Sequence, residues 1–197
     1  MLKFLFTVVA CFALASVANA AITPALDGTP TVDGSDFLWT YQISVDSLEE
    51  LVAAGSTPCS SAASCGSFFT IYDFAGYVPG SITAPAGWSF QVALAGPGLT
   101  NSTQSPDEPT FDDLTFVYTG PPVTELGPVN LSGFSAQSTF NTVNLDGTFT
   151  YQADNAVGLD AGIGPIEVPV ATPEPSMAVP IGLGVIGTVL RRRKRRP

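Results

Sequence analysis

Trp39-Thr40-Tyr41-Gln42-Ile43-Ser44-Val45 is the stretch of sequence that decides the fold. Its large apolar residues alternate with polar ones, and a period of two places all the apolar side chains on one face of a β-strand. A second stretch, 88–94, has the same pattern: Trp88, Phe90, Val92 and Leu94 alternate with Ser89, Gln91 and Ala93. Both stretches predict strands with one buried and one open face.

Further strands rich in threonine and aromatic residues are expected at 68–74, 114–119, 129–134 and 147–153. Asp146-Gly147 predicts a hairpin turn between 143–145 and 148–151. One helix is expected, because Ser47-Leu48-Glu49-Glu50 fits a capping box and Gly55 fits a C-terminal stop. The fold class expected for residues 21–171 is therefore mainly β, a single antiparallel β-sandwich-like domain.

The first twenty residues have the three parts of a secretory signal peptide. Lys3 supplies the positive charge, an apolar core follows at 4–17, and Ala18-Asn19-Ala20 is a small-x-small cleavage site ahead of Ala21. We therefore expect export, and a mature protein that begins at Ala21. Lipoprotein cleavage at Cys11 is a competing interpretation, which the short apolar run before Cys11 disfavours.

Residues 21–171 contain no Lys, Arg or His, and they hold 16 of the 17 acidic residues, all except Glu174. No side-chain salt bridge can form within this part of the chain, so its stability must come from apolar burial and backbone hydrogen bonds. The acidity disfavours anionic partners such as nucleic acid. The missing residue types also exclude Ser-His-Asp, Cys-His and Schiff-base chemistry, and we expect no catalytic activity.

Carboxylates are the chemically active side chains that remain, and they are densest at Asp107, Glu108, Asp112 and Asp113. Hard oxygen ligands suit Ca²⁺, so these four residues are candidate ligands, although the stretch lacks the Asp-x-Asp-x-Asp-Gly pattern of a calcium loop. Two carboxylates also serve glycoside hydrolysis, but adjacent strand residues point to opposite faces, which separates Asp112 from Asp113. A solvated acidic loop is the alternative that stays open.

Cys59 and Cys65 are the cysteines that remain once residues 1–20 are removed. Small residues at 60–64 make a flexible loop between them, which an oxidising compartment would close into a disulfide. A ring of this size contributes about 2 kcal/mol, so the bridge should fix a loop ahead of the strand at 68–74. A redox or metal-binding pair is disfavoured, because no His or further Cys is available to complete a site.

The C-terminus combines three features in order. Pro173-Glu174-Pro175 precedes a Gly-rich apolar segment at 177–190, and six basic residues follow: Arg191, Arg192, Arg193, Lys194, Arg195 and Arg196. The 14 apolar residues would make a helix about 21 Å long, shorter than the ~30 Å hydrocarbon core of a bilayer. The cations resist translocation, so we expect the basic end in the cytoplasm and the preceding domain outside.

This tail resembles the PEP-CTERM sorting signal of Gram-negative bacteria, and the resemblance covers residues 172–197. It implies a substrate of exosortase, a multi-spanning membrane protease. Pro173, Glu174 and Pro175 would be the recognition element, and 191–196 the cytoplasmic retention signal. The resemblance implies an intermediate anchored in the inner membrane, then cleavage near Pro-Glu-Pro and delivery to the outer cell surface or exopolysaccharide matrix. The stretches 69–74 and 113–120 also resemble exported domains that carry this signal.

Two functions stay open. The first is a non-enzymatic envelope or matrix protein, sorted through its tail and displayed among extracellular polysaccharide. The second is a carbohydrate- or Ca²⁺-binding module, in which Trp39, Trp88, Tyr72, Tyr77 or Tyr118 would stack on sugars. Aromatic residues at alternating strand positions are more often core than ligand platform.

Overall fold

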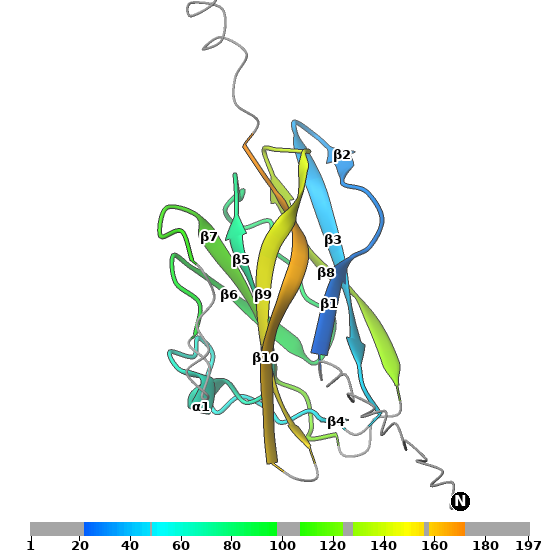
Figure 1. The fold of residues 1–197 in the computed structure, drawn as a ribbon, viewed down its shortest axis with the longest axis vertical. Helices are drawn as coiled ribbons and strands as arrows, with labels where there is room; N and C mark the ends of the chain where they lie inside the picture. The colour runs from blue at the N-terminus through cyan, green and yellow to red at the C-terminus, as the bar shows by residue number, and fades with distance from the viewer. Residues whose placement is uncertain (1–21, 48, 98–106, 124–127, 156–157, 172–197) are drawn as a thin grey trace, which may run out of the picture.

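Two antiparallel β-sheets pack face to face in the computed structural model, which describes residues 22–171 except 48, 98–106, 124–127 and 156–157 (Figure 1). The predicted signal peptide, with Ala18, Ala20 and Ala21, lies outside the described residues, as does the predicted sorting signal at 172–197. Within the described ranges, no helix has the length and apolar character needed to cross a bilayer.

The smaller sheet is built around β3 (Asp36–Val45). β1 (Ile22–Leu26) and β2 (Thr31–Asp33) pair with successive parts of one edge of β3, and β8 (Val129–Ser138) pairs with the other edge. The inward side chains of β3 are each at most 1 % exposed: Trp39, Tyr41, Ile43 and Val45. The alternation in the sequence therefore predicted this strand and its buried face correctly.

The larger sheet has the strand order β10-β9-β5-β7-β6, and β4 also pairs with β9. Its strands are β4 (Glu49–Glu50), β5 (Phe68–Phe74), β6 (Trp88–Ala93), β7 (Asp112–Tyr118), β9 (Val143–Asn155) and β10 (Gly158–Pro169). A single helical turn, α1 (Ala62–Cys65), precedes β5. The architecture is thus mainly antiparallel β with two sheets, in agreement with a β-sandwich.

Aromatic side chains dominate the core between the sheets. Phe134 of the smaller sheet packs edge-on against Phe69 and Phe116 of the larger one, with ring centroids 5.1 and 5.2 Å apart. Each such pair adds about 0.5–1.5 kcal/mol to the stabilisation from burial alone. The alternating stretch at 88–94 is buried only in part, because β6 is an edge strand and Phe90 remains 41 % exposed.

Two local predictions from the sequence are wrong. No helix starts at Ser47; instead Glu49 and Glu50 form β4 against the end of β9, where a partner strand satisfies their backbone groups. Asp146-Gly147 is not a hairpin turn, because β9 runs unbroken through both residues. A Cβ at Gly147 would lie 2.5 Å from the carbonyl oxygen of Ile166. Glycine there permits close packing of two strands and does not mark a turn.

Candidate functional site

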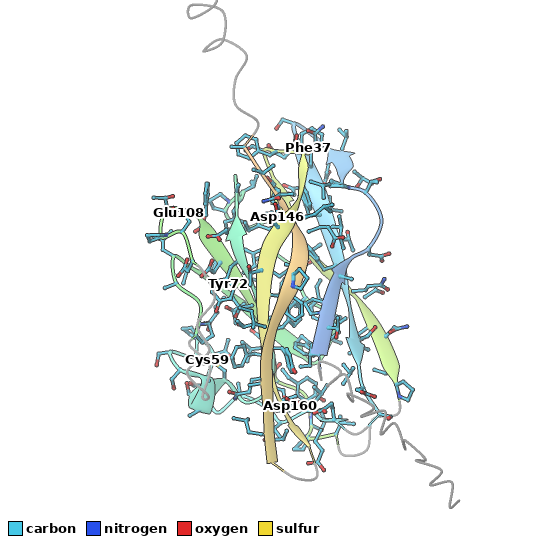
Figure 2. The ribbon with its side chains drawn as sticks, in the orientation of Figure 1. Phe37, Cys59, Tyr72, Glu108, Asp146 and Asp160 are labelled. Atoms are coloured by element: carbon cyan, nitrogen blue, oxygen red, sulfur yellow. A yellow bond between two sulfur atoms is a disulfide. The ribbon has the colours of Figure 1, made fainter. Side chains whose placement is uncertain are left out.

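Three carboxylates come together where β5 ends and β7 begins. Asp73 of β5, Asp113 of β7 and Asp107, which precedes β7, each place an oxygen within 4.8 Å of the other two. β5 and β7 pair antiparallel, so the end of one lies beside the start of the other. Figure 2 labels Glu108, the chain neighbour of Asp107, on this side of the molecule. We call Asp73, Asp107 and Asp113 the acidic cluster.

A β-bulge directs Asp73 toward the cluster. Strict alternation would place Asp73 in the core behind Phe69 and Ile71, but the register with β7 shifts between Ile71 and Phe74. Asp73 adopts a left-handed backbone conformation with a φ of 57°, and Phe74 takes the core position in its place. Aspartate is among the few residues besides glycine that tolerate this conformation. The bulge therefore keeps a carboxylate out of the core and puts a phenyl ring into it.

Backbone N–H groups hold two of the carboxylates in place. Asp113 Oδ1 accepts a hydrogen bond from the Asp73 N–H at 3.1 Å, and its Oδ2 accepts one from the Gly96 N–H at 2.7 Å. Asp73 Oδ1 accepts from the Glu108 N–H at 2.8 Å. These bonds connect the bulge in β5 with the segment that follows β6 and the segment that precedes β7.

Burial and the charges of neighbouring carboxylates raise the pKa values of Asp113 and Asp73. Asp113 is fully buried, and burial is the main reason that its pKa is raised to about 7. The charges of Asp107 and Asp73 add to this rise, whereas the N–H groups of Asp73 and Gly96 oppose it. The pKa of Asp73 is raised too, first by burial and then by the charges of Asp107 and Glu108. Since residues 21–171 contain no cationic side chain, a proton or a bound cation must offset this charge.

The oxygen set suits a hard divalent cation. Ca²⁺ binds carboxylate oxygens at about 2.3–2.6 Å, so oxygens on opposite sides of the ion lie about 4.6–5.2 Å apart. The 4.8 Å limit of the acidic cluster is compatible with that span. The residues that would hold the ion are Asp73, Asp107 and Asp113.

The structure brings together two of the four candidate ligands named from the sequence. Asp107 and Asp113 belong to the acidic cluster, whereas the carboxylates of Glu108 and Asp112 do not. Asp112 precedes Asp113 in β7 and therefore faces the opposite side of the strand. Glu108 contributes its N–H group to Asp73. The sequence analysis did not name Asp73 as a candidate ligand. The signal that could have identified it is an acidic residue at a strand position where alternation predicts a buried side chain.

Four of the five aromatic side chains considered for sugar stacking are buried. Trp39, Trp88, Tyr72 and Tyr118 are each at most 8 % exposed, so these four are core residues. Tyr77 is half-buried and packs edge-on against Phe74.

Cys59 and Cys65 form the predicted disulfide in the loop that precedes β5. The side-chain amide of Gln91 exchanges two hydrogen bonds with the backbone of Cys59, which anchors the loop to β6. The disulfide packs on Phe68 and Val117, on the face of the larger sheet that is turned away from the main core. The bridged loop is therefore a cover for this outer face.

No protein-family model and no curated protein matches this chain. The resemblance of residues 172–197 to a PEP-CTERM signal consequently stays a prediction from the sequence.

Proposed function

We propose that the chain is an exported, non-enzymatic protein of the bacterial envelope or extracellular matrix, sorted and cleaved through its tail. The observation that carries the proposal is the order Pro173-Glu174-Pro175, apolar segment 177–190, basic residues 191–196. The predicted signal peptide at 1–20 supports the same route. The disulfide supports it too, because such bridges persist in oxidising compartments outside the cytoplasm.

Each part of the tail has a physical role in this proposal. Six cations at 191–196 would hold the C-terminus at the cytoplasmic face, because moving them through the bilayer is costly. Pro173 and Pro175 lack backbone N–H groups and have a fixed φ, and such residues favour the extended backbone that a protease groove binds. The partners are an exosortase-type enzyme, the inner membrane during sorting, and extracellular polysaccharide after release.

Mass spectrometry of the protein from its native cells, from both envelope and spent medium, tests the proposal. We expect chains that start at Ala21 and end between Pro173 and Ser176. A Glu174→Gln variant should accumulate with its tail intact, whereas Glu167→Gln, a matched change in β10, should be processed normally. A parent chain that ends at Pro197 in both fractions would refute the sorting route.

Ca²⁺ binding is a second candidate function, which the acidic cluster favours. An ion bound to Asp73, Asp107 and Asp113 would replace the proton held there and would supply the positive charge that residues 21–171 lack. Because Ca²⁺ would bind the folded state alone, it would raise stability in proportion to the logarithm of its concentration. It would also tie the chain around Gly96 and Glu108 to β5 and β7.

Calorimetric titration with CaCl₂ tests this second function. We expect heat of binding and a raised unfolding temperature for the parent chain, loss of both in Asp113→Asn, and retention of both in the neighbouring Asp112→Asn variant. A parent chain that gives neither heat nor a temperature shift would rule out the site.

A further inference from the structure

Four strand ends meet at one end of the sandwich. β3 starts there beside the end of β8, because Phe37 pairs with Ser138. β9 starts there beside the end of β10, because Val143 pairs with Pro169. Figure 1 shows β10 ending near the start of β3. We call this the exit end, since the described part of the chain leaves the sandwich here and stops at Ala171.

The length of chain after Ala171 limits how far the exit end can stand from a bilayer. Residues 172–176 separate Ala171 from the apolar segment 177–190. The steps from residue 171 to residue 177 span at most about 20 Å when fully extended. The headgroup layer takes up about 5–7 Å of that span. In the membrane-anchored intermediate the exit end therefore lies within about 15 Å of the headgroups.

The two most exposed large apolar side chains of the described residues lie toward this end. Val32 is 75 % exposed, and Leu145 is 68 % exposed. Val32 belongs to β2 and pairs with Phe37, while Leu145 lies near the start of β9. Figure 2 labels Phe37 and Asp146, the chain neighbour of Leu145, in the part of the molecule where β10 ends. Apolar side chains as exposed as these gain free energy when they leave water.

A carboxylate stands next to each of these apolar side chains. Asp33 follows Val32, Asp146 follows Leu145, and both acidic residues are exposed. The Gln137 amide donates to Asp33 Oδ2 at 2.6 Å and leaves the negative charge in place. Residues 21–171 contain no cationic side chain that could pair with them. The primary ammonium group of phosphatidylethanolamine supplies a cation with three N–H donors, whereas an anionic headgroup repels carboxylates.

We propose that the exit end docks on the bilayer surface while the tail anchors the chain. Val32 and Leu145 lie at the boundary between headgroups and acyl chains. Asp33 and Asp146 pair with ethanolamine ammonium groups. The inference rests on the proposed sorting route, which supplies the anchor. A weak contact is sufficient, because a short tether raises the local concentration of a surface to about the millimolar range, and cleavage of the tail then releases the domain.

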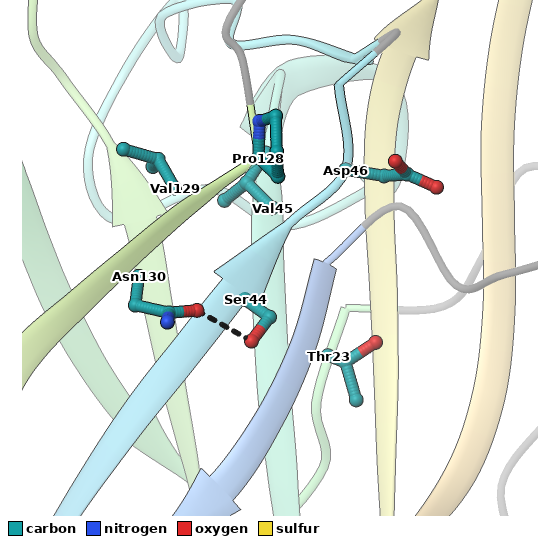
Figure 3. Close-up of a pocket in the computed structure, with 7 residues that line it drawn as sticks. All are labelled: Thr23, Ser44, Val45, Asp46, Pro128, Val129 and Asn130. Carbon is teal, nitrogen blue, oxygen red and sulfur yellow. Dashed lines mark hydrogen bonds between the residues drawn. The ribbon is translucent and has the colours of Figure 1, made fainter.

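The opposite end of the sandwich is turned away from the bilayer in this arrangement. β1 begins and β3 ends there, beside a cavity of about 310 Å³ whose lining includes Thr23, Ser44, Asn130 and Asp46 (Figure 3). β4 follows Asp46 and pairs with the end of β9, so β10 begins at this end too. Leu159 of β10 is 47 % exposed. Leu159 and Asp46 are therefore a matched apolar side chain and carboxylate far from the exit end.

Tryptophan fluorescence in vesicles tests the proposal. The chain without its signal peptide but with its tail intact is reconstituted into vesicles of phosphatidylethanolamine and phosphatidylcholine, with or without bromine on the acyl chains as a quencher. We expect the brominated lipid to quench the added fluorescence of Val32→Trp and of Leu145→Trp, and to leave that of Leu159→Trp unchanged. Trp39 and Trp88 are at most 8 % exposed and give a constant background.

The headgroup composition tests the charge pairing. Replacing phosphatidylethanolamine by phosphatidylglycerol should abolish the quenching of Val32→Trp, because the anionic headgroup repels the exit end. In the same Val32→Trp chain, Asp33→Asn combined with Asp146→Asn should remove this dependence on the headgroup. Asp46→Asn, at the opposite end, should leave the dependence as it was.

Flotation of the vesicles separates failure of the docking from failure of the sorting route. A chain that floats with the vesicles and is folded by circular dichroism, but shows no quenching at Val32→Trp or Leu145→Trp, would overturn the docking alone. So would equal quenching at Leu159→Trp. Equal quenching in ethanolamine and glycerol lipids would overturn the pairing of the carboxylates. A chain that does not float with the vesicles would refute the anchor, and with it the sorting route.

Discussion

Asp113 is a fully buried carboxyl group in a part of the chain that has no cationic side chain. Both of its oxygens accept backbone N–H bonds, which favour the charged form, while burial and the neighbouring acids favour the neutral form. The second influence is the stronger, because the pKa is raised to about 7. Asp113 therefore couples proton binding to the geometry of the bulge at Asp73.

Stability without Ca²⁺ should fall as the pH rises from about 4 to about 7 and then level off. The pKa of Asp113 is about 7 in the folded chain and about 3.9 in the unfolded chain, so the folded state holds the extra proton in this window. The free energy of unfolding then decreases by up to about 1.4 kcal/mol per pH unit. Urea unfolding across the window measures the slope. Asp113→Asn should flatten it and Asp112→Asn should not; a flat profile in the parent chain would contradict the prediction.

At the scale of elements, β10 shows how glycines shape an edge strand. Gly162 and Gly164 stand opposite Tyr151 and Phe149 of β9. A Cβ at Gly162 would lie 2.7 Å from the Tyr151 ring, and one at Gly164 would lie 2.6 Å from the Phe149 ring. The two rings lie against the bare backbone of β10, so the glycines make room for aromatic side chains at the edge of the sheet.

Substitution of either glycine should destabilise the domain. We expect Gly162→Ala and Gly164→Ala each to lower the free energy of unfolding by about 1–3 kcal/mol, because the added methyl group must displace a ring or the strand. Ile163→Ala, between them and 41 % exposed, should cost less than either. Equilibrium unfolding in urea measures all three. If the glycine variants lose no more free energy of unfolding than Ile163→Ala does, the close approach of the rings to β10 does not contribute to stability.

The disulfide loop is a second element with a testable contribution. Replacing both Cys59 and Cys65 by alanine should lower the free energy of unfolding by about 2 kcal/mol, the value for a small closed ring. Reductant should reproduce this loss in the parent chain and have no effect on the double variant. A parent chain whose urea midpoint is unchanged by reductant would show that the anchor at Gln91, and not the bridge, holds the cover in place.

At the scale of the whole molecule, the charge distribution of residues 21–171 is one-sided. All 16 charged side chains are acidic, so carboxylates repel one another across this whole part of the chain as well as within the acidic cluster. Self-repulsion of this kind destabilises a compact state and is screened by salt. The sandwich must therefore rely on its aromatic core, as the edge-on packing of Phe134 against Phe69 and Phe116 indicates.

Ionic strength should consequently raise the stability of the domain. Between about 0.01 M and about 1 M salt the screening length falls from about 30 Å to about 3 Å, which removes most of the repulsion among surface carboxylates. We expect the midpoint of thermal unfolding at neutral pH to rise with NaCl and equally with tetramethylammonium chloride. A rise with NaCl alone would indicate specific ion binding, and no rise with either salt would contradict the role of repulsion.

Local patterns in the sequence were sufficient for most of the fold. Alternation predicted the buried face of β3, and it located β5, β6 and β7 within a residue or two of their observed ends. The capping-box pattern at Ser47 gave a wrong prediction, because Glu49 and Glu50 pair instead with a strand about a hundred positions later. Alternation gave no prediction for β10, in which glycines and prolines interrupt the pattern and two glycines pack against rings of β9.

The sequence by itself determined the fold class, the disulfide between Cys59 and Cys65, the one-sided charge and the tail on which the sorting proposal rests. These follow from composition, from period and from residues a few positions apart. Only the tertiary structure decided that Asp73 joins Asp107 and Asp113, and that Val45 of β3 pairs with Ile22 of β1. The reason is physical: strand pairing joins residues such as Asp73 and Asp113, 40 positions apart. A one-residue bulge changes which side chains meet, and no local pattern specifies it.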